Sequence, residues 1–194
     1  MKKIMFNDLY GLTQAVLEGR KTQTRRIAYQ GTFKRYCNCG FCTEGKDKGK
    51  LFINDGNEIV AKSKYKIGEV VAVAQSYIDI PVTEEIYRSK LASAGWQNKM
   101  FVKSSVMPHQ IKITRIRIEH LQSISTEDCI KEGIFISHIE GFKDAYSYDA
   151  TNDRKVKKWW YQTPIEAYKM LCDKLKLHWG INPLVFVYDF ELVK

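Results

Sequence analysis

A short segment near the amino terminus combines side-chain types that suit binding of an anionic or polar ligand. Residues 16–26 read Val-Leu-Glu-Gly-Arg-Lys-Thr-Gln-Thr-Arg-Arg, so cations alternate with hydroxyl groups after Gly19. Lys and Arg supply positive charge, and a Thr hydroxyl both donates and accepts hydrogen bonds. The segment therefore favours an anionic or polar ligand. The alternative is a basic strand edge that discourages aggregation.

Three cysteines lie close together in the sequence as Cys37-x-Cys39-x2-Cys42. Thiolates bind zinc, but a structural zinc site needs four ligands, usually as two pairs, and only three are local. A zinc site, reduced loop thiols and a redox function all remain open for this cluster.

A second basic segment carries aromatic residues. Residues 154–161 read Arg-Lys-Val-Lys-Lys-Trp-Trp-Tyr. Cations of this kind can meet phosphates while the rings stack on unpaired bases. The alternative is that the tryptophans pack on the core and the cations are solvated. Arg115, on a later predicted strand, can likewise either contact nucleic acid or be an ordinary solvated cation.

Length and composition narrow the class of protein. The 194 residues are 44% hydrophobic and 27% charged, which suits one folded domain rather than a disordered chain. No apolar run approaches the roughly 18 residues of a membrane span, and the first residues lack the apolar stretch of a signal peptide. We therefore expect a cytoplasmic protein with reduced cysteines and no membrane partner. Nothing resembles a Walker or Rossmann phosphate loop.

The positive charge is concentrated. The net charge is +9, and residues 20–66 hold twelve Lys and Arg residues but only four acids. A concentrated basic segment favours a polyanion, usually nucleic acid. The alternative is a solvated loop in a basic protein.

The remaining elements must position these groups. We expect a helix after Asn7 or Asp8 that ends at Gly19, and a dense apolar strand within residues 65–80. The apolar positions of 111–121 change phase, which predicts a β-bulge near Thr114 and Arg115. Further expected elements are a helix opening at 83–85 and ending at Gly95, a helix from Ser125 to Gly133, a helix after the capping box 163–166, and a closing strand at 184–193. Residues 30–57 and 137–158 are predicted polar loops or insertions.

Four motifs in order resemble ASCH domains, which are related to PUA domains. The first is Gly-Arg-Lys-Thr-x-Thr-x-Arg at 19–26, and the second is Tyr-Lys-x-Gly-Glu at 65–69. The third is Ile-Ser-x-Glu-Asp-x-Ile-x-Glu-Gly at 124–133, and the fourth is Trp-Gly-x-Asn-Pro-x-Val-x-Val at 179–187, as in larger phage-type members. The resemblance implies an α+β fold with a PUA-like mixed β-barrel, flanking helices and the two insertions, in a single domain spanning 1–194.

The resemblance also implies a function. ASCH domains are proposed to bind RNA or nucleotides, and small bacterial members that share the first motif are acetylcytidine amidohydrolases. Their catalytic Lys and Thr match Lys21 and Thr24, and their catalytic Glu matches Glu132. Because positions 21 and 24 of a regular strand face opposite sides, convergence requires a turn or bulge in 20–26. Alternatively, Glu132 is a solvated acid at a helix end.

We therefore expect a domain that binds RNA or a modified nucleoside in a basic cleft. One alternative is an amidohydrolase that uses Lys21, Thr24 and Glu132, and another is a protein-interaction module without a nucleic-acid role. The residues expected to contact the ligand are Arg20, Thr22, Arg25, Arg26, Lys66, Arg115, Lys157, Lys158 and Trp159. No cofactor is expected, apart from the zinc alternative at the cysteines.

Overall fold

The computed structural model describes the chain except for residues 30–36, 139–142, 149–158 and 194. Its main sheet has five strands in the order β1-β6-β7-β10-β2, with β1 and β6 parallel and every other pair antiparallel. The strand bounds are β1 Lys3–Ile4, β2 Gln23–Tyr29, β6 Val70–Val73, β7 Gln110–His120 and β10 Leu184–Leu192. The first and last strands of this order are sheet edges.

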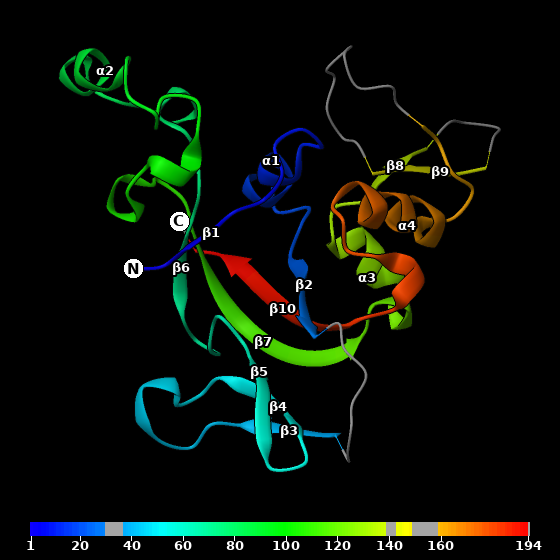
Figure 1. Ribbon diagram of the computed structural model, residues 1–194. Coiled ribbons are helices and arrows are strands. Elements are labelled where there is room, and N and C mark those ends of the chain that lie inside the picture. Colours follow the sequence, from blue (N-terminus) through cyan, green and yellow to red (C-terminus); the bar gives the residue numbers. More distant parts are fainter. Residues whose placement is uncertain (30–36, 139–142, 149–158, 194) are drawn as a thin grey trace.

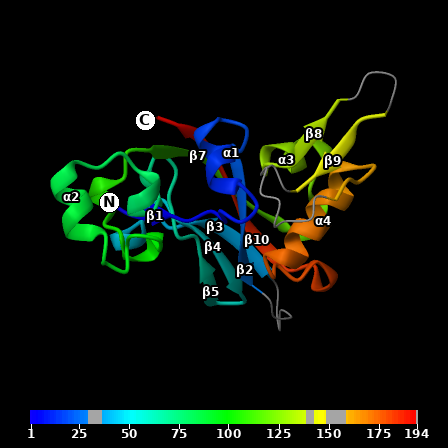
Figure 2. The same cartoon turned by 90° about the horizontal axis from the view of Figure 1, so that it is seen from above.

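Two smaller sheets and four α-helices complete the described part of the chain. The second sheet contains β3 (Cys37–Phe41), β4 (Leu51–Asp55) and β5 (Glu58–Lys62), and the third pairs β8 (Phe135–Ser137) with β9 (Ala145–Ser147). The helices are α1 (Leu12–Leu17), α2 (Glu84–Lys90), α3 (Thr126–Lys131) and α4 (Pro164–Lys174). Figures 1 and 2 show α1, α3 and α4 gathered near the curved main sheet and α2 apart from them.

The α+β class is confirmed by these elements, but the described residues form no closed barrel. The main core joins strands β7 and β10 to α1 and α4, and includes Ile113, Val187, Val16 and Leu171. A smaller core around Tyr77 and Met107 lies after β6. Within the described residues, no helix is long and apolar enough to cross a membrane.

The predicted bulge in β7 is confirmed. Asp189 of β10 pairs with Arg115, whereas the next residue, Phe190, pairs with Ile113, so Thr114 has no partner in the ladder. This extra residue keeps Ile113 and Ile116 buried although they are three positions apart. The Thr163–Glu166 capping box and the Ser125 and Thr83 helix caps are confirmed too.

Two predictions about local structure are wrong. The interpretation of 30–57 as a loop is wrong, because this interval contains β3, β4 and the turn into β5; Gly56-Asn57 forms that two-residue turn, with Gly56 at a φ of 66°. The alternative that 30–57 is an insertion stays a prediction. The first helix begins only at Leu12, because the Asn7 amide oxygen accepts a hydrogen bond from the Leu9 N–H in a local turn.

The other boundaries differ less. Helix α2 ends at Lys90 instead of continuing to Gly95. The second predicted insertion, 137–158, starts at the last residue of β8 and contains β9, and its residues 139–142 and 149–158 lie outside the described part of the chain.

Candidate functional site

A cavity of about 270 Å³ lies between the N-terminal segment, β2, the end of α3 and α4. We call it the Lys21 cavity. Its lining residues are Phe6, Asn7, Leu12, Lys21, Thr24, Arg25, Arg26, Glu132, Tyr168, Leu171, Leu175 and Leu177. The cavity therefore brings together the three residues that the ASCH resemblance marks as catalytic, which come from two distant segments of the sequence.

The chain turns between α1 and β2, and this turn brings Lys21 into the cavity. Gly19 has a φ of +72°, a left-handed conformation that glycine adopts at little cost. The Lys21 N–H donates to the Ala15 carbonyl oxygen at 2.8 Å, and the Thr22 N–H donates to that of Lys131 at 2.9 Å. Strand β2 begins only at Gln23. The predicted irregularity is confirmed, so Lys21 and Thr24 line one cavity instead of opposite faces of a strand.

Lys21 and Glu132 form a buried ion pair. The Lys21 Nζ lies 2.6 Å from Glu132 Oε2 and 2.6 Å from the Glu132 backbone oxygen. Their side chains are only 2% and 5% exposed, so the alternative of a solvated Glu132 is wrong. Burial lowers the pKa of Lys21, because it penalises the ammonium form; the Glu132 carboxylate acts against this effect, and Arg26 and Arg25 add to it.

Arg25 holds the carboxylates around this pair. It donates to Glu119 at 2.9 and 2.5 Å, to Asp128 at 3.1 Å and to Glu132 Oε1 at 3.1 Å. Burial opposes the charged form of Arg25, yet Glu132 and Glu119 raise its pKa overall. Because its guanidinium is already engaged by three acids, we interpret Arg25 as a positioning residue for Glu132 rather than a ligand contact.

Three polar groups in the cavity keep hydrogen-bonding capacity. The Thr24 hydroxyl and the Asn7 amide nitrogen donate no hydrogen bond to the residues that the structure describes. The Tyr168 hydroxyl lies beside the Cys172 thiol and has no nitrogen or oxygen partner in that part of the chain. Aromatic and leucine side chains form the remaining walls, so the site can hold a flat, partly apolar ligand and satisfy a few polar groups on it.

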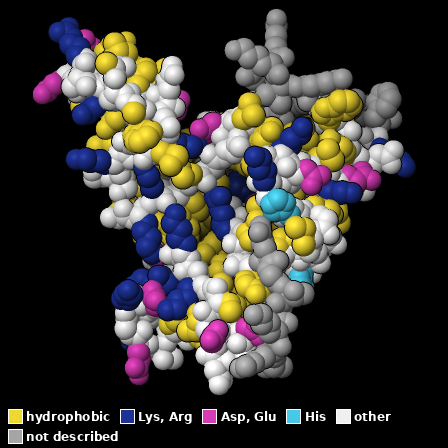
Figure 3. All heavy atoms as spheres, in the orientation of Figure 1, with side chains coloured by type: hydrophobic (Ala, Val, Ile, Leu, Met, Phe, Trp, Pro, Cys, Tyr) yellow, Lys and Arg dark blue, Asp and Glu magenta, His cyan; other side chains and the backbone are white. Residues whose placement is uncertain are grey.

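Among the three cationic residues that line the Lys21 cavity, only Arg26 is exposed. Its side chain also makes contacts outside this cavity. Its Nη2 donates to the Met5 carbonyl oxygen at 2.6 Å, and its guanidinium lies 5.8 Å from the Phe6 ring centre. Arg26 also lines a neighbouring groove of about 420 Å³ together with Lys62 and Lys64. Lys and Arg side chains gather on the hollowed face seen in Figure 3. This arrangement extends positive charge away from the cavity mouth.

Other predicted contact residues lie outside the Lys21 cavity. Arg20 pairs with Glu18 at 2.6 Å, and Thr22 is held by its backbone. The backbone N–H of Lys66 donates to Glu69 at 3.0 Å, next to β6. Arg20, Thr22, Lys66 and the exposed Arg115 therefore do not line the Lys21 cavity, and their role as contacts for RNA or a nucleoside stays a prediction. Trp159 is half exposed, and Lys157 and Lys158 lie outside the described residues.

The cysteine cluster is only partly described. Cys39 is exposed and Cys42 is half-buried, both as free thiols, while the Cys37 side chain lies outside the description. The described residues contain no group of three or more potential ligands that could hold a metal ion. The zinc alternative stays a prediction.

Sequence reasoning missed several lining residues. Asn7 was predicted only as a helix cap, Tyr168 falls within the helix predicted after the capping box 163–166, and Phe6 was not singled out. The polar end of Tyr168 is a usable signal, since a buried tyrosine hydroxyl usually finds a partner. Asp128, Glu119 and Arg117 form the surrounding ion-pair network, and nothing in their local spacing indicates it.

In comparisons with known proteins, no family model, curated protein or solved structure matches this chain.

Proposed function

We propose that this chain binds RNA or a modified nucleoside, with the base in the Lys21 cavity. The observation that carries the proposal is the meeting of Lys21, Thr24 and Glu132 in one cavity. The three residues come from two separate sequence motifs, at 19–26 and 124–133. Their convergence supports the resemblance to ASCH domains, although the barrel of that family remains part of the proposal.

The positions of the four motifs support the same assignment. The first spans the turn from α1 into β2, and the second leads into β6. The third contains α3 and ends at Gly133, and the fourth leads into β10. The motifs thus mark the turn, helix and strands that build the cavity and its sheet. We propose on this basis that the curved main sheet is a variant of the PUA-like arrangement.

The chemistry of the cavity suits a nucleobase. Its volume of about 270 Å³ is near the lower end of the ~300–1,000 Å³ range of small-molecule sites. Phe6 and Leu171 can contact the faces of a base, and the Asn7 amide and Thr24 hydroxyl can meet its polar edge. Arg26 at the mouth and Lys64 in the next groove can meet phosphates of an attached strand.

Binding of a short single-stranded RNA at several salt concentrations tests this function. We expect affinity to fall with salt, because each phosphate contact releases counterions, and Arg26→Ala to reduce the logarithmic salt slope by about 0.7. Glu85→Gln on α2 is the distant control and should change nothing. If neither RNA nor a nucleoside binds, the protein-interaction alternative takes the place of this proposal.

Hydrolysis of an acyl amide on the nucleoside is a second candidate. The observation that favours it is a buried Lys21 of lowered pKa in the same cavity as the Thr24 hydroxyl. A neutral lysine is a suitable general base for a threonine nucleophile. Glu132 Oε2, 2.6 Å from Nζ, can take the proton that leaves Lys21 neutral.

Thr24, Lys21 and one water molecule account for every bond and proton in this hydrolysis. The Thr24 oxygen attacks the acyl carbon while its proton passes to Lys21. The carbon–nitrogen bond then breaks, Lys21 returns a proton to the leaving amine, and an ester on Thr24 remains. Water attacks this ester, which releases the carboxylic acid and regenerates the Thr24 hydroxyl. The sum is acyl amide plus water giving amine plus acid.

A further inference from the structure

A second cavity lies on the other side of α1. It has a volume of about 600 Å³ and is lined by Thr13 and Gln14, whereas Leu12 of the same helix lines the Lys21 cavity. We call it the Asp79 cavity. In a chain of net charge +9, the carboxylates lining it are Asp8 and Asp79, and no Lys or Arg is among its described lining residues. The lining of this cavity therefore carries acidic side chains, whereas the chain as a whole is positively charged.

One wall of the Asp79 cavity already binds an ammonium group of this chain. The Lys99 Nζ donates to the Asp8 carboxylate at 2.7 Å, to the Thr13 hydroxyl at 3.1 Å and to the Phe6 backbone oxygen at 2.5 Å. The Thr13 hydroxyl also donates to Asp8. A carboxylate, a hydroxyl and a carbonyl-type oxygen thus surround the cation.

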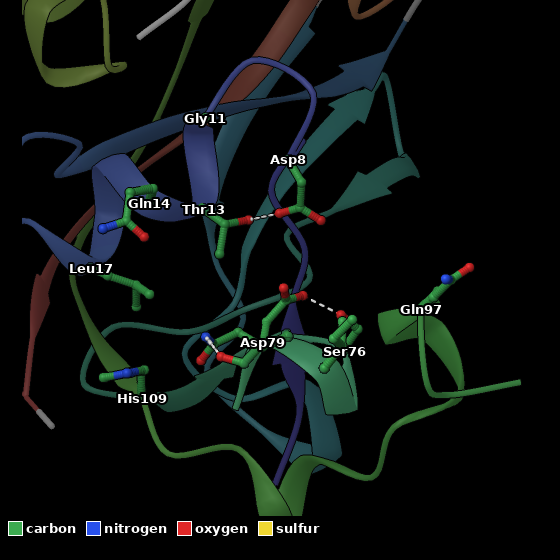
Figure 4. A pocket seen from close by; sticks show the side chains of 11 residues that line it. Asp8, Gly11, Thr13, Gln14, Leu17, Ser76, Asp79, Gln97 and His109 are labelled. Atoms are coloured by element: carbon green, nitrogen blue, oxygen red, sulfur yellow. Dashed lines mark hydrogen bonds between the residues drawn. The ribbon is translucent and has the colours of Figure 1, made fainter. Parts of the chain in front are cut away.

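The opposite wall presents the same three kinds of group. Figure 4 shows the Asp79–Ser76 pair facing the Asp8–Thr13 pair across the cavity, with the Ser76 hydroxyl hydrogen-bonded to the Asp79 carboxylate. Gln75 supplies the third group, an amide oxygen. Asp79 forms no ion pair with any residue that the structure describes.

Gln75 gives an independent indication of a ligand. Gln75 is only 5% exposed, and its side-chain amide nitrogen donates a long hydrogen bond of 3.4 Å to the Asp79 backbone oxygen. Its amide oxygen is buried and has no hydrogen-bond partner within the described chain. A buried acceptor without a donor is costly, so its place in the lining of a polar cavity points to a donor supplied from outside.

We propose that the Asp79 cavity binds a small organic cation with a primary ammonium group, such as an aliphatic diamine. The ammonium donates to the Asp79 carboxylate and the Gln75 amide oxygen, as Lys99 donates to Asp8 and the Phe6 carbonyl on the facing wall. Gln14 and Gln97, which also line the cavity, can hydrogen-bond the far end of the ligand. This proposal is independent of the function proposed for the Lys21 cavity.

Titration calorimetry of the full chain with butane-1,4-diamine tests the proposal, with butane-1,4-diol as the uncharged probe of matched length. We expect one saturable diamine site, weakened at higher salt, and no binding of the diol. Asp79→Asn keeps the side-chain shape and removes the charge, so it should weaken diamine binding by about tenfold or more. Glu85→Gln removes an exposed acid on α2 and is the matched control.

Nuclear magnetic resonance locates the bound diamine. The side-chain amide signal of Gln75 should shift on titration in the wild type, and Gln75→Leu should weaken binding while circular dichroism shows a folded chain. The proposal is overturned if the diol binds as well as the diamine. It is equally overturned if Asp79→Asn and Glu85→Gln bind the diamine as the wild type does.

Discussion

The ammonium nitrogen of Lys21 lies 2.6 Å from both the carboxylate oxygen Oε2 and the backbone oxygen of Glu132. These residues are 111 positions apart and both are buried. The pair therefore ties the turn before β2 to the end of α3. It also places a cation of lowered pKa at the wall of the Lys21 cavity.

Lys21→Met should destabilise the fold by about 3 kcal/mol, because it leaves the buried Glu132 charge without its closest partner. Urea unfolding measures the change. Arg20→Met is the matched control, since Arg20 pairs with the exposed Glu18 and such surface pairs contribute less than about 1 kcal/mol. Equal losses in both variants would contradict the buried-pair account.

Arg25→Lys should destabilise the protein by about 2 kcal/mol although it keeps the charge. A lysine ammonium cannot bridge Glu119, Asp128 and Glu132 as the guanidinium does, so buried carboxylates lose partners. The same change at Arg88, an exposed residue paired with Glu84 on α2, should cost little. Thermal unfolding of both variants checks the difference, and a stable Arg25→Lys protein would argue against the positioning role.

The turn that ends α3 beside Lys21 depends on Gly133. Its φ is +101°, and an added Cβ would lie 3.3 Å from a Leu12 methyl carbon and 3.6 Å from the Lys21 side chain. We expect Gly133→Ala to cost at least about 1–2 kcal/mol from the backbone conformation alone. Gly180 has open space around it and no positive φ, so Gly180→Ala should be neutral in the same denaturation assay. A neutral Gly133→Ala would contradict this description of the turn.

The buried thiol of Cys129 makes the free energy of unfolding depend on pH in the alkaline range. Burial raises the pKa of its thiol from 9.0 to about 12, so the folded state keeps a proton that the unfolded state loses. Its contribution is complete below pH 9 and is lost as pH rises toward 12, at up to about 1.4 kcal/mol per pH unit. The stability difference between wild type and Cys129→Ala should therefore shrink from pH 9 to 10.5.

A core substitution without a titratable group separates this effect from general alkaline weakening. Ile113 is fully buried in β7, and the stability difference between wild type and Ile113→Val should stay constant over the same pH range. Denaturant titrations at each pH provide both differences. A constant difference for Cys129→Ala as well would refute the buried-thiol account.

Local sequence signals predicted much of the fold. The change of apolar phase gave the bulge at Thr114, and Ser125 and Thr163 marked helix starts, because bulges and caps depend on neighbouring residues. Long-range relations were not predictable in this way. The pairing of Arg25 with Glu119 depends on how β2 and β7 lie beside β10, and single-sequence periodicity does not encode that order.

The candidate site was predicted only in part, because some of its residues belong to local motifs and others are brought to it by long-range packing. The motif resemblance named Lys21, Thr24 and Glu132, and the turn after Gly19 explains how two of them converge. Arg20, which was expected in the same cleft, pairs with Glu18 instead, because the turn after Gly19 brings Lys21 but not Arg20 into the cavity. Asn7 was missed because its local turn resembles a helix cap.

The most direct test of the proposed site is incubation of the protein with acetylcytidine, measuring its binding and the release of cytidine. The proposed function predicts saturable binding. The hydrolase candidate predicts turnover as well, with loss of turnover in Thr24→Val and its retention in Thr24→Ser. Thr22→Val is the control, since Thr22 lies outside the Lys21 cavity and should leave turnover unchanged. Binding without turnover would leave the binding function and remove the hydrolase candidate. Neither binding nor turnover, or full activity in Thr24→Val, would contradict the assignment of the Lys21 cavity.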